Sequence, residues 1–386
     1  MNLAKLQSVH DFKRAARRRL PRIVFDYVEG GTEDESCLDR NAEALDRINL
    51  LPRYLIDVRS TSQKTGLLGR NYELPFGIAP MGMAGMVRHG ADLMMAGAAR
   101  AANIPFVLSG VATESIEAAA ERAGDNLWVQ IHASRDPAVN KAQIDRALAV
   151  GVETMILTID VPVTAKRERD LRNGWVRPYT PSASAVIEAA FHPAWVLGYL
   201  RSGLPYFENW RAHAPAGSTA LGVAAYLATQ VPASPAWADL ARFRSWWPGQ
   251  LLLKGVLVPE DAARARESGV DGLIVSNHGG RQLDTAPAPI TMLPAIRRAV
   301  GPDFPLIFDS GIRRGSDIVK ALAAGADFTL VGRAIAYGVA AGGEAGASRV
   351  IDILCNELHR AQAQLGRPAI VDIDNAVLAG FNAPIA

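Results

Sequence analysis

The chain has 386 residues, 49% of them hydrophobic, which is enough for one large globular domain or two ordinary ones. Its 41 basic and 39 acidic residues give a formal net charge of +2, so the overall charge predicts no nucleic acid partner. Two distant cysteines, Cys37 and Cys355, without CxxC spacing predict neither a disulfide framework nor a zinc site, and we expect no metal and a cytoplasmic location.

The first 27 residues are basic, but they lack the continuous apolar region and the cleavage site of a secretory signal. They predict an amphipathic helix, and we expect residues 1–60 to form an N-terminal helical segment. No stretch contains 18 or more uninterrupted apolar residues, so no bilayer-spanning helix is expected. The sequence leaves open whether the protein attaches to a membrane surface.

Eight short apolar runs follow, each ending in polar or glycine residues. Alanine-rich segments with helical spacing separate most of them, and several of these segments end in glycine. This alternation predicts a (β/α)8 barrel, a TIM barrel, over residues 61–386, within a single domain of residues 1–386. An open doubly wound sheet is the alternative, but no GxGxxG motif follows the first run. The runs lie at residues 74–80, 105–110, 127–132, 154–160, 251–256, 272–280, 305–311 and 328–333.

The spacing between the fourth and fifth runs is far longer than elsewhere and predicts an insertion at about 174–217. Such long segments are typically lids, binding surfaces or disordered. Its core, "AAFHPAWVLGYLRSGLPYF", is too apolar for a linker, and aromatic residues beside arginines suit a membrane interface. A lid or a subunit contact would bury the same side chains, so both interpretations stay open.

The predicted carboxyl ends of the strands are unusually polar, and catalysis in such barrels takes place at these ends. A barrel used only as a scaffold has no reason to place charged residues there, because unpaired buried charge is costly. The residues are Pro80, Gly82, Ser109, Gln130, His132, Thr158, Asp160, Lys254, Ser276, His278, Arg281, Asp309, Arg313, Gly332 and Arg333.

The last two runs carry a phosphate-binding pattern. "DSGIRRGSD" places glycine and two arginines before a helix start, and "LVGR" adds Gly332 and Arg333. Backbone N–H groups and a helix N-terminus face the anion in this common phosphate site. A phosphorylated substrate fits the pattern as well as a phosphorylated cofactor.

His278 is a candidate general base, although a lone histidine is more often structural. Its context strengthens the hypothesis, since Gly279 and Gly280 allow a ligand to approach closely. Arg281 can bind a carboxylate bidentately, and Asp160 can orient the imidazole and stabilise its protonated form.

Five motifs, "YVEGG", "LTIDVPVTAKRERD", "LLLKG", "SNHGGRQLD" and "DSGIRRGSD", occur in consistent order. With them the chain resembles the FMN-dependent L-2-hydroxy acid oxidases and dehydrogenases from about residue 8 to 375. The resemblance implies that His278 takes a proton from the substrate as two electrons pass to the flavin, while Asp160 pairs with that histidine. It implies that Arg281 and Arg167 bind the substrate carboxylate, with Tyr27 as a hydroxyl contact.

The resemblance also implies FMN as cofactor and Lys254 as the cation beside flavin N1 and O2. A phosphate site after the last two strands would hold the FMN phosphate. The implied cofactor-binding residues are Ala79, Pro80, Met81, Gly82, Ser109, Gln130, Thr158, Lys254, Ser276, Asp309, Ser310, Gly311, Arg313, Gly332 and Arg333.

Three departures bear on the substrate and the electron acceptor. His132 stands where the family usually has a tyrosine, and a histidine is shorter and can itself titrate. Met81 replaces the usual threonine, and Gly82 resembles the dehydrogenase branch, which reacts slowly with oxygen. The aromatic insertion resembles the membrane-binding segment of quinone-linked members.

The resemblance therefore implies oxidation of an L-2-hydroxy acid, with electrons passing to a quinone or similar acceptor. It implies a homotetramer, peripheral on the inner face of the cell membrane through residues 180–215. A soluble oxidase that uses O2 and produces H2O2 is the alternative. A non-redox enzyme acting on a phosphorylated substrate, or a catalytically silent flavoprotein, would also fit the barrel.

Overall fold

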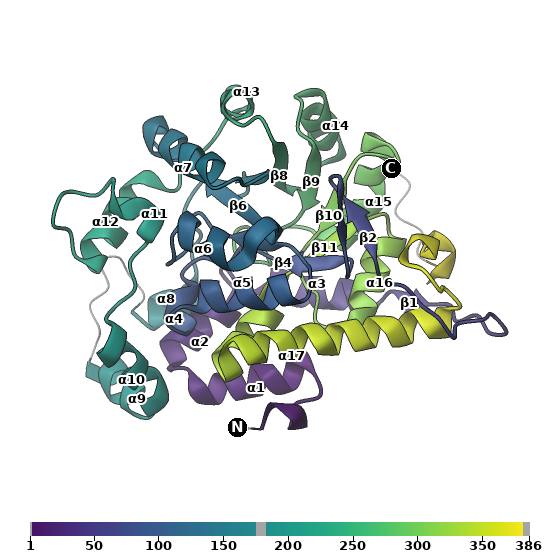
Figure 1. Cartoon of the computed structure of the whole chain (residues 1–386), viewed down its shortest axis with the longest axis horizontal. Coiled ribbons are helices and arrows are strands. Elements are labelled where there is room, and N and C mark those ends of the chain that lie inside the picture. Colours follow the sequence, from purple (N-terminus) through teal and green to yellow (C-terminus); the bar gives the residue numbers. More distant parts are fainter. Residues whose placement is uncertain (1, 175–182, 381–386) are drawn as a thin grey trace.

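The computed structural model describes residues 2–174 and 183–380. At its centre is a closed barrel of eight parallel strands, in which the last strand pairs with the first (Figure 1). The predicted (β/α)8 barrel is confirmed, and each of the eight runs corresponds to one strand. They are β4 (Phe76–Ile78), β5 (Phe106–Leu108), β6 (Leu127–His132), β7 (Thr154–Thr158), β8 (Gln250–Val256), β9 (Gly272–Val275), β10 (Leu306–Phe308) and β11 (Phe328–Val331).

Most predicted runs extend past the observed carboxyl ends of the strands. Pairing between β9 and β10, for example, ends at Val275 and Phe308. The polar residues that follow do not pair with a neighbouring strand. They form loops at the carboxyl-terminal rim of the barrel, where the candidate site lies. Sequence pattern alone does not separate the last paired residue from the first rim residue.

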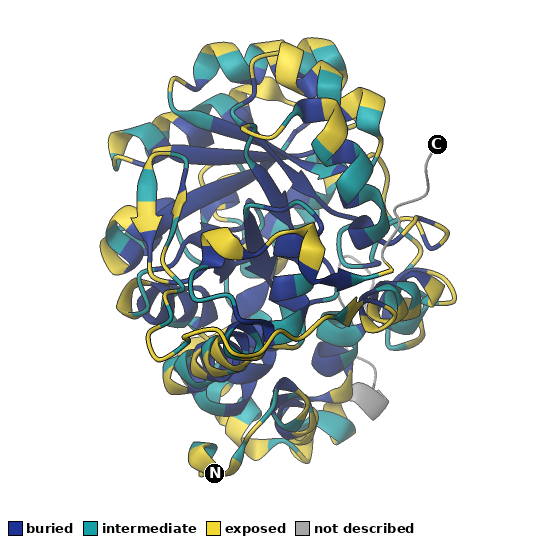
Figure 2. Ribbon diagram, turned by 90° about the vertical axis from the view of Figure 1, so that its right-hand side faces the viewer, coloured by how far each residue is buried: buried dark blue, intermediate teal, exposed yellow. Residues whose placement is uncertain are grey.

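One helix of the barrel layer follows each strand, and the strands are buried beneath these helices (Figure 2). The last helix has non-helical dihedral angles at Gly343, where it kinks. The helices are α5 (Ala91–Ala101), α6 (Ile116–Ala123), α7 (Pro137–Ala149), α13 (Trp237–Trp246), α14 (Pro259–Glu267), α15 (Pro289–Val300), α16 (Gly315–Ala323) and α17 (Arg333–Leu365).

The N-terminal segment is helical as expected up to residue 46, but as several short helices. A capping box at Ser8 starts the second of them, and Pro21 separates it from the next, since proline has no N–H to continue a helix. The basic stretch therefore folds as a 3-10 turn and two α-helices instead of one helix. The segment contains η1 (Leu3–Lys5), α1 (Val9–Arg19), α2 (Arg22–Glu29) and α3 (Ser36–Asp46).

Strand β1 (Asn49–Leu50) pairs with β12 (Leu378–Ala379), so the two ends of the chain meet. The hairpin of β2 (Thr65–Leu67) and β3 (Arg70–Tyr72) packs into the barrel interior, where Tyr72 lies 6.5 Å from Trp128 between ring centroids. Sequence analysis predicted neither element. Short 3-10 turns lie at η2 (Gly124–Asn126), η3 (Ile370–Asp372) and η4 (Asn375–Val377).

Extra helices between β7 and α13 form the insertion and continue to Gln230, beyond the predicted limit of 217; residues 175–182 of the predicted stretch lie outside the described residues. Helix α10 packs on α4 (Ala84–Val87) through Trp195 Nε1, which donates to the Met86 carbonyl at 2.9 Å, and through the Tyr199 hydroxyl, which donates to the Gly85 carbonyl. The insertion is therefore joined to the loop after the first barrel strand. Its helices are α8 (Glu168–Arg172), α9 (Ala183–Ala190), α10 (Pro193–Ser202), α11 (Glu208–Arg211) and α12 (Ala220–Gln230).

In the described ranges, 2–174 and 183–380, no helix has the length and apolar character needed to cross a bilayer.

Candidate active site

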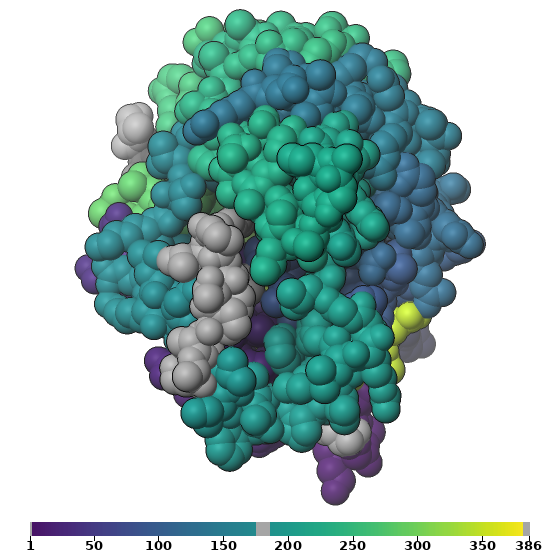
Figure 3. All heavy atoms as spheres, turned by 90° about the vertical axis from the view of Figure 1, so that its left-hand side faces the viewer, coloured from purple at the N-terminus to yellow at the C-terminus, as the bar shows by residue number. Residues whose placement is uncertain are grey.

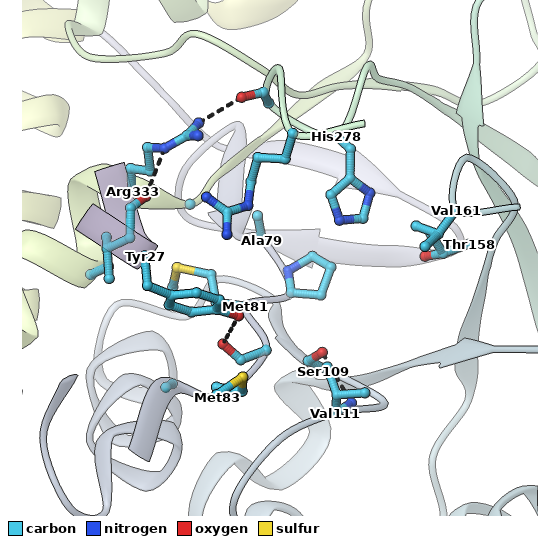
Figure 4. Close-up of a pocket in the computed structure, with 18 of the residues that line it drawn as sticks. Tyr27, Ala79, Met81, Met83, Ser109, Val111, Thr158, Val161, His278 and Arg333 are labelled. Atoms are coloured by element: carbon cyan, nitrogen blue, oxygen red, sulfur yellow. Dashed lines mark hydrogen bonds between the residues drawn. The ribbon is translucent and has the colours of Figure 1, made fainter. Parts of the chain in front are cut away.

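A cavity of about 660 Å³ opens at the carboxyl ends of the strands (Figure 4). Nearly all residues that the sequence analysis selected line it, although they come from every barrel strand and from the N-terminal segment. The exceptions are Asp160 and Ser276, which lie behind the lining residues, and Gly280, where a Cβ atom would meet Leu38 of α3 at 2.9 Å. The predicted residues that line it are Tyr27, Ala79, Pro80, Met81, Gly82, Ser109, Gln130, His132, Thr158, Arg167, Lys254, His278, Arg281, Asp309, Ser310, Gly311, Arg313, Gly332 and Arg333.

His278 and Asp160 form a pair at the wall of this cavity. The Nδ1 atom of His278 lies 2.8 Å from Asp160 Oδ1, so its other ring nitrogen is left for a ligand. His278 has a φ of +57°, a conformation rarely adopted by residues other than glycine. Gln282 helps to hold Asp160 in place, because its Nε2 donates to the backbone carbonyl of Asp160 at 3.0 Å. Sequence analysis gave Gln282 no role, although it lies within "SNHGGRQLD".

The pKa values of the pair suit a neutral base beside an anion. Burial lowers the pKa of His278, and Asp160 opposes this effect without cancelling it. Burial by itself raises the pKa of Asp160, but the neighbouring His278 and Lys254 outweigh it and the pKa is lowered. At neutral pH the imidazole can therefore accept a proton, and the carboxylate stabilises the resulting cation.

Lys254 is a buried cation next to the pair. Burial lowers its pKa, but Asp309 and Asp160 reverse the effect and the pKa is raised. Its Nζ lies 3.2 Å from Asp309 Oδ2 and 2.7 Å from the Ser276 hydroxyl. Ser276 also accepts the backbone N–H of His278 at 3.0 Å. Ser276 is fully buried and supports Lys254 and His278 from behind, while its predicted contact with the cofactor stays a prediction.

Arg281, Arg167 and Tyr27 lie together at one side of the cavity. Arg281 donates to the Gly30 carbonyl at 2.6 Å, and its guanidinium lies 5.0 Å from the centre of the Tyr27 ring. The Tyr27 hydroxyl donates to the Gly82 carbonyl at 3.3 Å (Figure 4). Two guanidinium groups beside a phenol suit an organic carboxylate.

His132 faces His278 across the cavity, with 6.4 Å between ring centroids. Burial, followed by the charge of His278, lowers the pKa of His132 to about 3. A pKa this low keeps the imidazole of His132 neutral at physiological pH. No hydrogen bond links its ring nitrogens to the part of the chain that the structure describes, so the ring is available to a ligand.

An apolar wall completes this end of the cavity. Met83 and Val111 come from the loops after β4 and β5, and Leu227 and Val231 come from α12 and its end. Met83, Val111, Leu227 and Val231 belong to one hydrophobic cluster. Sequence analysis missed this contribution, because α12 lies outside both the strand ends and the predicted insertion.

Residues in the cavity wall can form hydrogen bonds with the polar edge of the FMN ring. The Nε2 atom of Gln130 and the hydroxyl of Thr158 are buried and have no hydrogen-bond partner among the described residues. The Oε1 atom of Gln130 accepts from the Ser109 hydroxyl and the Gly110 N–H, which leaves its Nε2 to donate to a ligand. Buried polar groups are rarely left unpaired, so a polar ring edge of a ligand is the expected partner.

The residues also fit the FMN phosphate at the far end. Burial and the charges of Arg281 and Arg313 lower the pKa of Arg333 to about 9, which indicates positive charge without enough anionic compensation. Arg333 begins α17, whose N-terminus faces the same cavity. The sequence predicts that Gly279 leaves space for a ligand. In the structure this space holds Arg333, because a Cβ atom at Gly279 would lie 2.8 Å from Arg333 Nη1. The glycine therefore accommodates Arg333, which donates to the Gly279 carbonyl.

Within the ranges that the structure describes, no group of three or more His, Cys, Asp or Glu side chains could hold a metal ion.

Comparisons with known proteins agree with this geometry. The sequence model of the family described as FMN-dependent dehydrogenase matches residues 16–380. The chain is 40% identical to (S)-mandelate dehydrogenase of Pseudomonas putida over 368 residues, 95% of this chain and 92% of that protein. It is 37% identical to L-lactate dehydrogenase of Pseudomonas syringae pv. syringae over 374 residues, 97% of this chain and 98% of that protein. The crystal structure of the monotopic membrane protein (S)-mandelate dehydrogenase superposes with a TM-score of 0.93 at 40% identity, covering 97% of this chain and 99% of that one.

Proposed function

The chain belongs to the FMN-dependent dehydrogenase family and oxidises an L-2-hydroxy acid to the 2-oxo acid, and from this premise we propose the roles of its residues. The observation that carries the proposal is the His278–Asp160 pair, 2.8 Å apart, in which His278 lines the same cavity as Arg281 and Lys254. FMN, when bound, supplies the acceptor for two electrons.

Arg281 and Arg167 bind the substrate carboxylate, and the hydroxyl of Tyr27 contacts the same group. This places the reacting carbon near His278, whose free ring nitrogen takes the proton. Asp160 holds the ring and stabilises the imidazolium that forms. Lys254 keeps a fixed positive charge where negative charge develops during the reaction, in a site from which burial excludes water.

We propose that the substituent of the substrate is large and apolar, as in an aromatic 2-hydroxy acid. The support is the wall of Met83, Val111, Leu227 and Val231, which offers a carbon surface without a charged partner. Anaerobic addition of L-mandelate, L-lactate and their D-enantiomers, followed by the flavin absorbance, tests this proposal. Faster bleaching by L-lactate than by L-mandelate would contradict it.

We propose a quinone as electron acceptor, reached from a membrane surface. Six large apolar side chains on and just after α9 and α10 are exposed, with Phe191 at 78% and Leu200 at 76%. Such a surface beside arginines suits the interfacial region of a bilayer. The related (S)-mandelate dehydrogenase is a monotopic membrane protein, which adds support for a peripheral location at a membrane. We propose the inner face of the cell membrane for this chain. The six residues are Val186, Ile187, Phe191, Leu197, Leu200 and Leu204.

Sedimentation with lipid vesicles tests the membrane proposal. The wild type is expected to sediment with vesicles, and a Phe191→Ser, Leu200→Ser variant is expected to stay in the supernatant with flavin reduction by substrate intact. A wild type that never sediments would contradict the proposal. Peroxide formation in air at a rate comparable to quinone reduction would instead favour the oxidase alternative.

We also propose a homotetramer, on the family resemblance alone. Size-exclusion chromatography with light scattering measures the assembly directly.

A further inference from the structure

The backbone carbonyl of Gly30 accepts hydrogen bonds from two arginines that have different proposed partners. Arg281 Nη1 donates to it at 2.6 Å, and Arg333 Nη2 donates to it at 2.9 Å. Arg281 is the proposed ligand of the substrate carboxylate, whereas Arg333 lies at the end of the cavity that fits the FMN phosphate. One backbone oxygen atom therefore links the two anion-binding ends of the site.

Both arginines keep N–H groups for a ligand. Arg333 also donates to the carbonyls of Val28 at 2.9 Å and Gly279 at 2.8 Å, so three of its five N–H groups hold it in place. Arg281 uses Nη1 for the Gly30 carbonyl, which leaves the edge formed by its Nε and Nη2 for a bidentate carboxylate. A shift of the Gly30 carbonyl would therefore move both guanidinium groups relative to their ligands.

The carboxylate of Glu35 sets the direction of this carbonyl. Its Oε1 accepts the backbone N–H of Gly31 at 3.0 Å, and that N–H belongs to the same peptide group as the Gly30 carbonyl. A trans peptide group is planar, and its N–H and C=O point in opposite directions. Glu35 on one side of the plane therefore aims the oxygen at the arginines on the other side. The fit is close, because a Cβ atom at Gly31 would lie 2.8 Å from the Gly280 carbonyl oxygen.

Glu35 is itself held by the insertion. Its second carboxylate oxygen pairs with Arg169 of α8, which also lies 3.6 Å from Asp26 of α2. Helix α8 directly follows Arg167, the second proposed ligand of the substrate carboxylate. Figure 3 shows the face on which the insertion (teal) lies beside the N-terminal segment (purple), which emerges at the lower edge. The Glu35–Arg169 pair thus joins both proposed carboxylate ligands to one turn of the N-terminal segment.

We propose that Glu35 is a positioning residue that couples the binding of the FMN phosphate to the binding of the substrate carboxylate. It holds the peptide group between Gly30 and Gly31, and this group fixes Arg333 and Arg281 together. The inference rests on the proposed function, which assigns the two arginines to their ligands. Glu35 does not line the cavity, so it acts through the turn and not by contact with either ligand. By linkage, each ligand favours binding of the other to the same extent.

Two variants of similar size test the proposal on the FMN-loaded enzyme. Glu35→Gln keeps an oxygen that can accept the Gly31 N–H, whereas Glu35→Met loses it. Both keep a side chain at the same left-handed backbone position, where φ is +64°, so the backbone strain is matched. We expect Glu35→Met to raise the dissociation constants of FMN and of the substrate about tenfold each, through loss of one hydrogen bond to a charged group. Glu35→Gln should restore both constants to near those of the wild type.

The limiting rate of flavin reduction should change less than about threefold in Glu35→Met, because His278 and Asp160 are untouched and the loss falls on binding. Fluorescence of free FMN, measured on dilution of the holoenzyme, gives the FMN constant. The concentration dependence of anaerobic flavin reduction gives the substrate constant and the limiting rate. The matched control is Glu117→Met, which removes a glutamate paired with Arg146 at 2.6 Å outside the cavity and should leave all three values unchanged.

The coupling itself is measured by repeating the dilution with the 2-oxo acid product, which carries the carboxylate and does not reduce the flavin. The product should tighten FMN binding in the wild type, and this factor should shrink severalfold in Glu35→Met but not in Glu35→Gln. Direct contact between product and flavin is common to all variants, so the difference reports the turn. A merely structural role for Glu35 would lower the thermal unfolding temperature and leave the factor unchanged.

An FMN constant unchanged in Glu35→Met would overturn the inference, as would a coupling factor equal in the wild type and Glu35→Met. Equal losses in Glu35→Gln and Glu35→Met would overturn it as well, because the charge and not the hydrogen bond to Gly31 would then be the cause. Failure of the proposed function has a different signature, in which no L-2-hydroxy acid reduces the flavin of the wild type. Normal reduction of the wild type with Glu35→Met behaving identically removes the positioning role alone.

Discussion

His278 and Asp160 lie 118 positions apart in sequence, yet Nδ1 of one and Oδ1 of the other are 2.8 Å apart. The carboxyl ends of β7 and β9 bring them together on either side of β8, which carries Lys254 between them. Three charged or ionisable groups thus come from three adjacent strands. Their mutual effects on pKa are the basis of the first three predictions.

Replacing His278 with glutamine should slow flavin reduction by substrate about 10²- to 10⁴-fold, because the amide cannot accept the proton. FMN should remain bound, since Gln130, Thr158 and Arg333 are untouched. Anaerobic stopped-flow absorbance measures the rate, and the flavin-to-protein ratio measures retention. A flavin reduction rate like that of the wild type would show that His278 is not the base.

Replacing Asp160 with asparagine should change the pH dependence of flavin reduction. Asp160 raises the pKa of His278 against the effect of burial, so its loss should lower that pKa further. The neutral, competent imidazole would then persist to lower pH, and the acidic limb of the rate profile should move to lower pH while the maximum rate falls. An acidic limb that moves to higher pH would contradict the assigned interaction.

Replacing Lys254 with methionine should lower the midpoint potential of the bound flavin and slow its reduction about 10²- to 10³-fold, because a fixed positive charge is lost beside the developing negative charge. Asp309 and Asp160 also lose their compensating cation, so the variant should be less stable. Potentiometric titration and thermal unfolding provide the two measurements. An unchanged midpoint potential would show that the charge of Lys254 does not act on the flavin.

Gly82 and Val111 provide a paired test of the pocket. A Cβ atom at Gly82 would lie 2.5 Å from Val111 Cγ2, so Gly82→Ala should displace Val111 and weaken substrate binding. The double variant Gly82→Ala, Val111→Ala removes that clash and should recover part of the lost affinity. Substrate affinity comes from the concentration dependence of flavin reduction. Equal losses in both variants would show that the clash is not the cause.

Replacing His132 with leucine should weaken substrate binding about tenfold, through loss of one neutral hydrogen-bonding group in the cavity. His132→Gln is the matched variant that keeps a donor and should retain most of the affinity. Because the pKa of His132 is about 3, neither variant should add or remove a titration between pH 5 and 9. A new pH limb in the leucine variant would contradict the neutral state of the ring.

The sequence by itself determined the barrel and the polar side of its site. Short apolar runs and alanine-rich helices recur locally, and each rim residue lies at or just after the carboxyl end of its strand, so parallel pairing places residues such as Gln130, Thr158 and Lys254 at one end. These relationships depend on local pattern and on parallel pairing, both of which can be read along the chain.

Only the tertiary structure decided the contacts between distant segments. In the folded chain Ser276 lies behind the cavity, and Arg333 occupies the space beside Gly279. Leu227 of α12 belongs to the apolar wall at the substrate end of the cavity. The tertiary structure also brought α1, α2, α8 and α9 together around a second cavity. Such contacts depend on where loops and helices pack after the barrel closes, and no local periodicity records that packing.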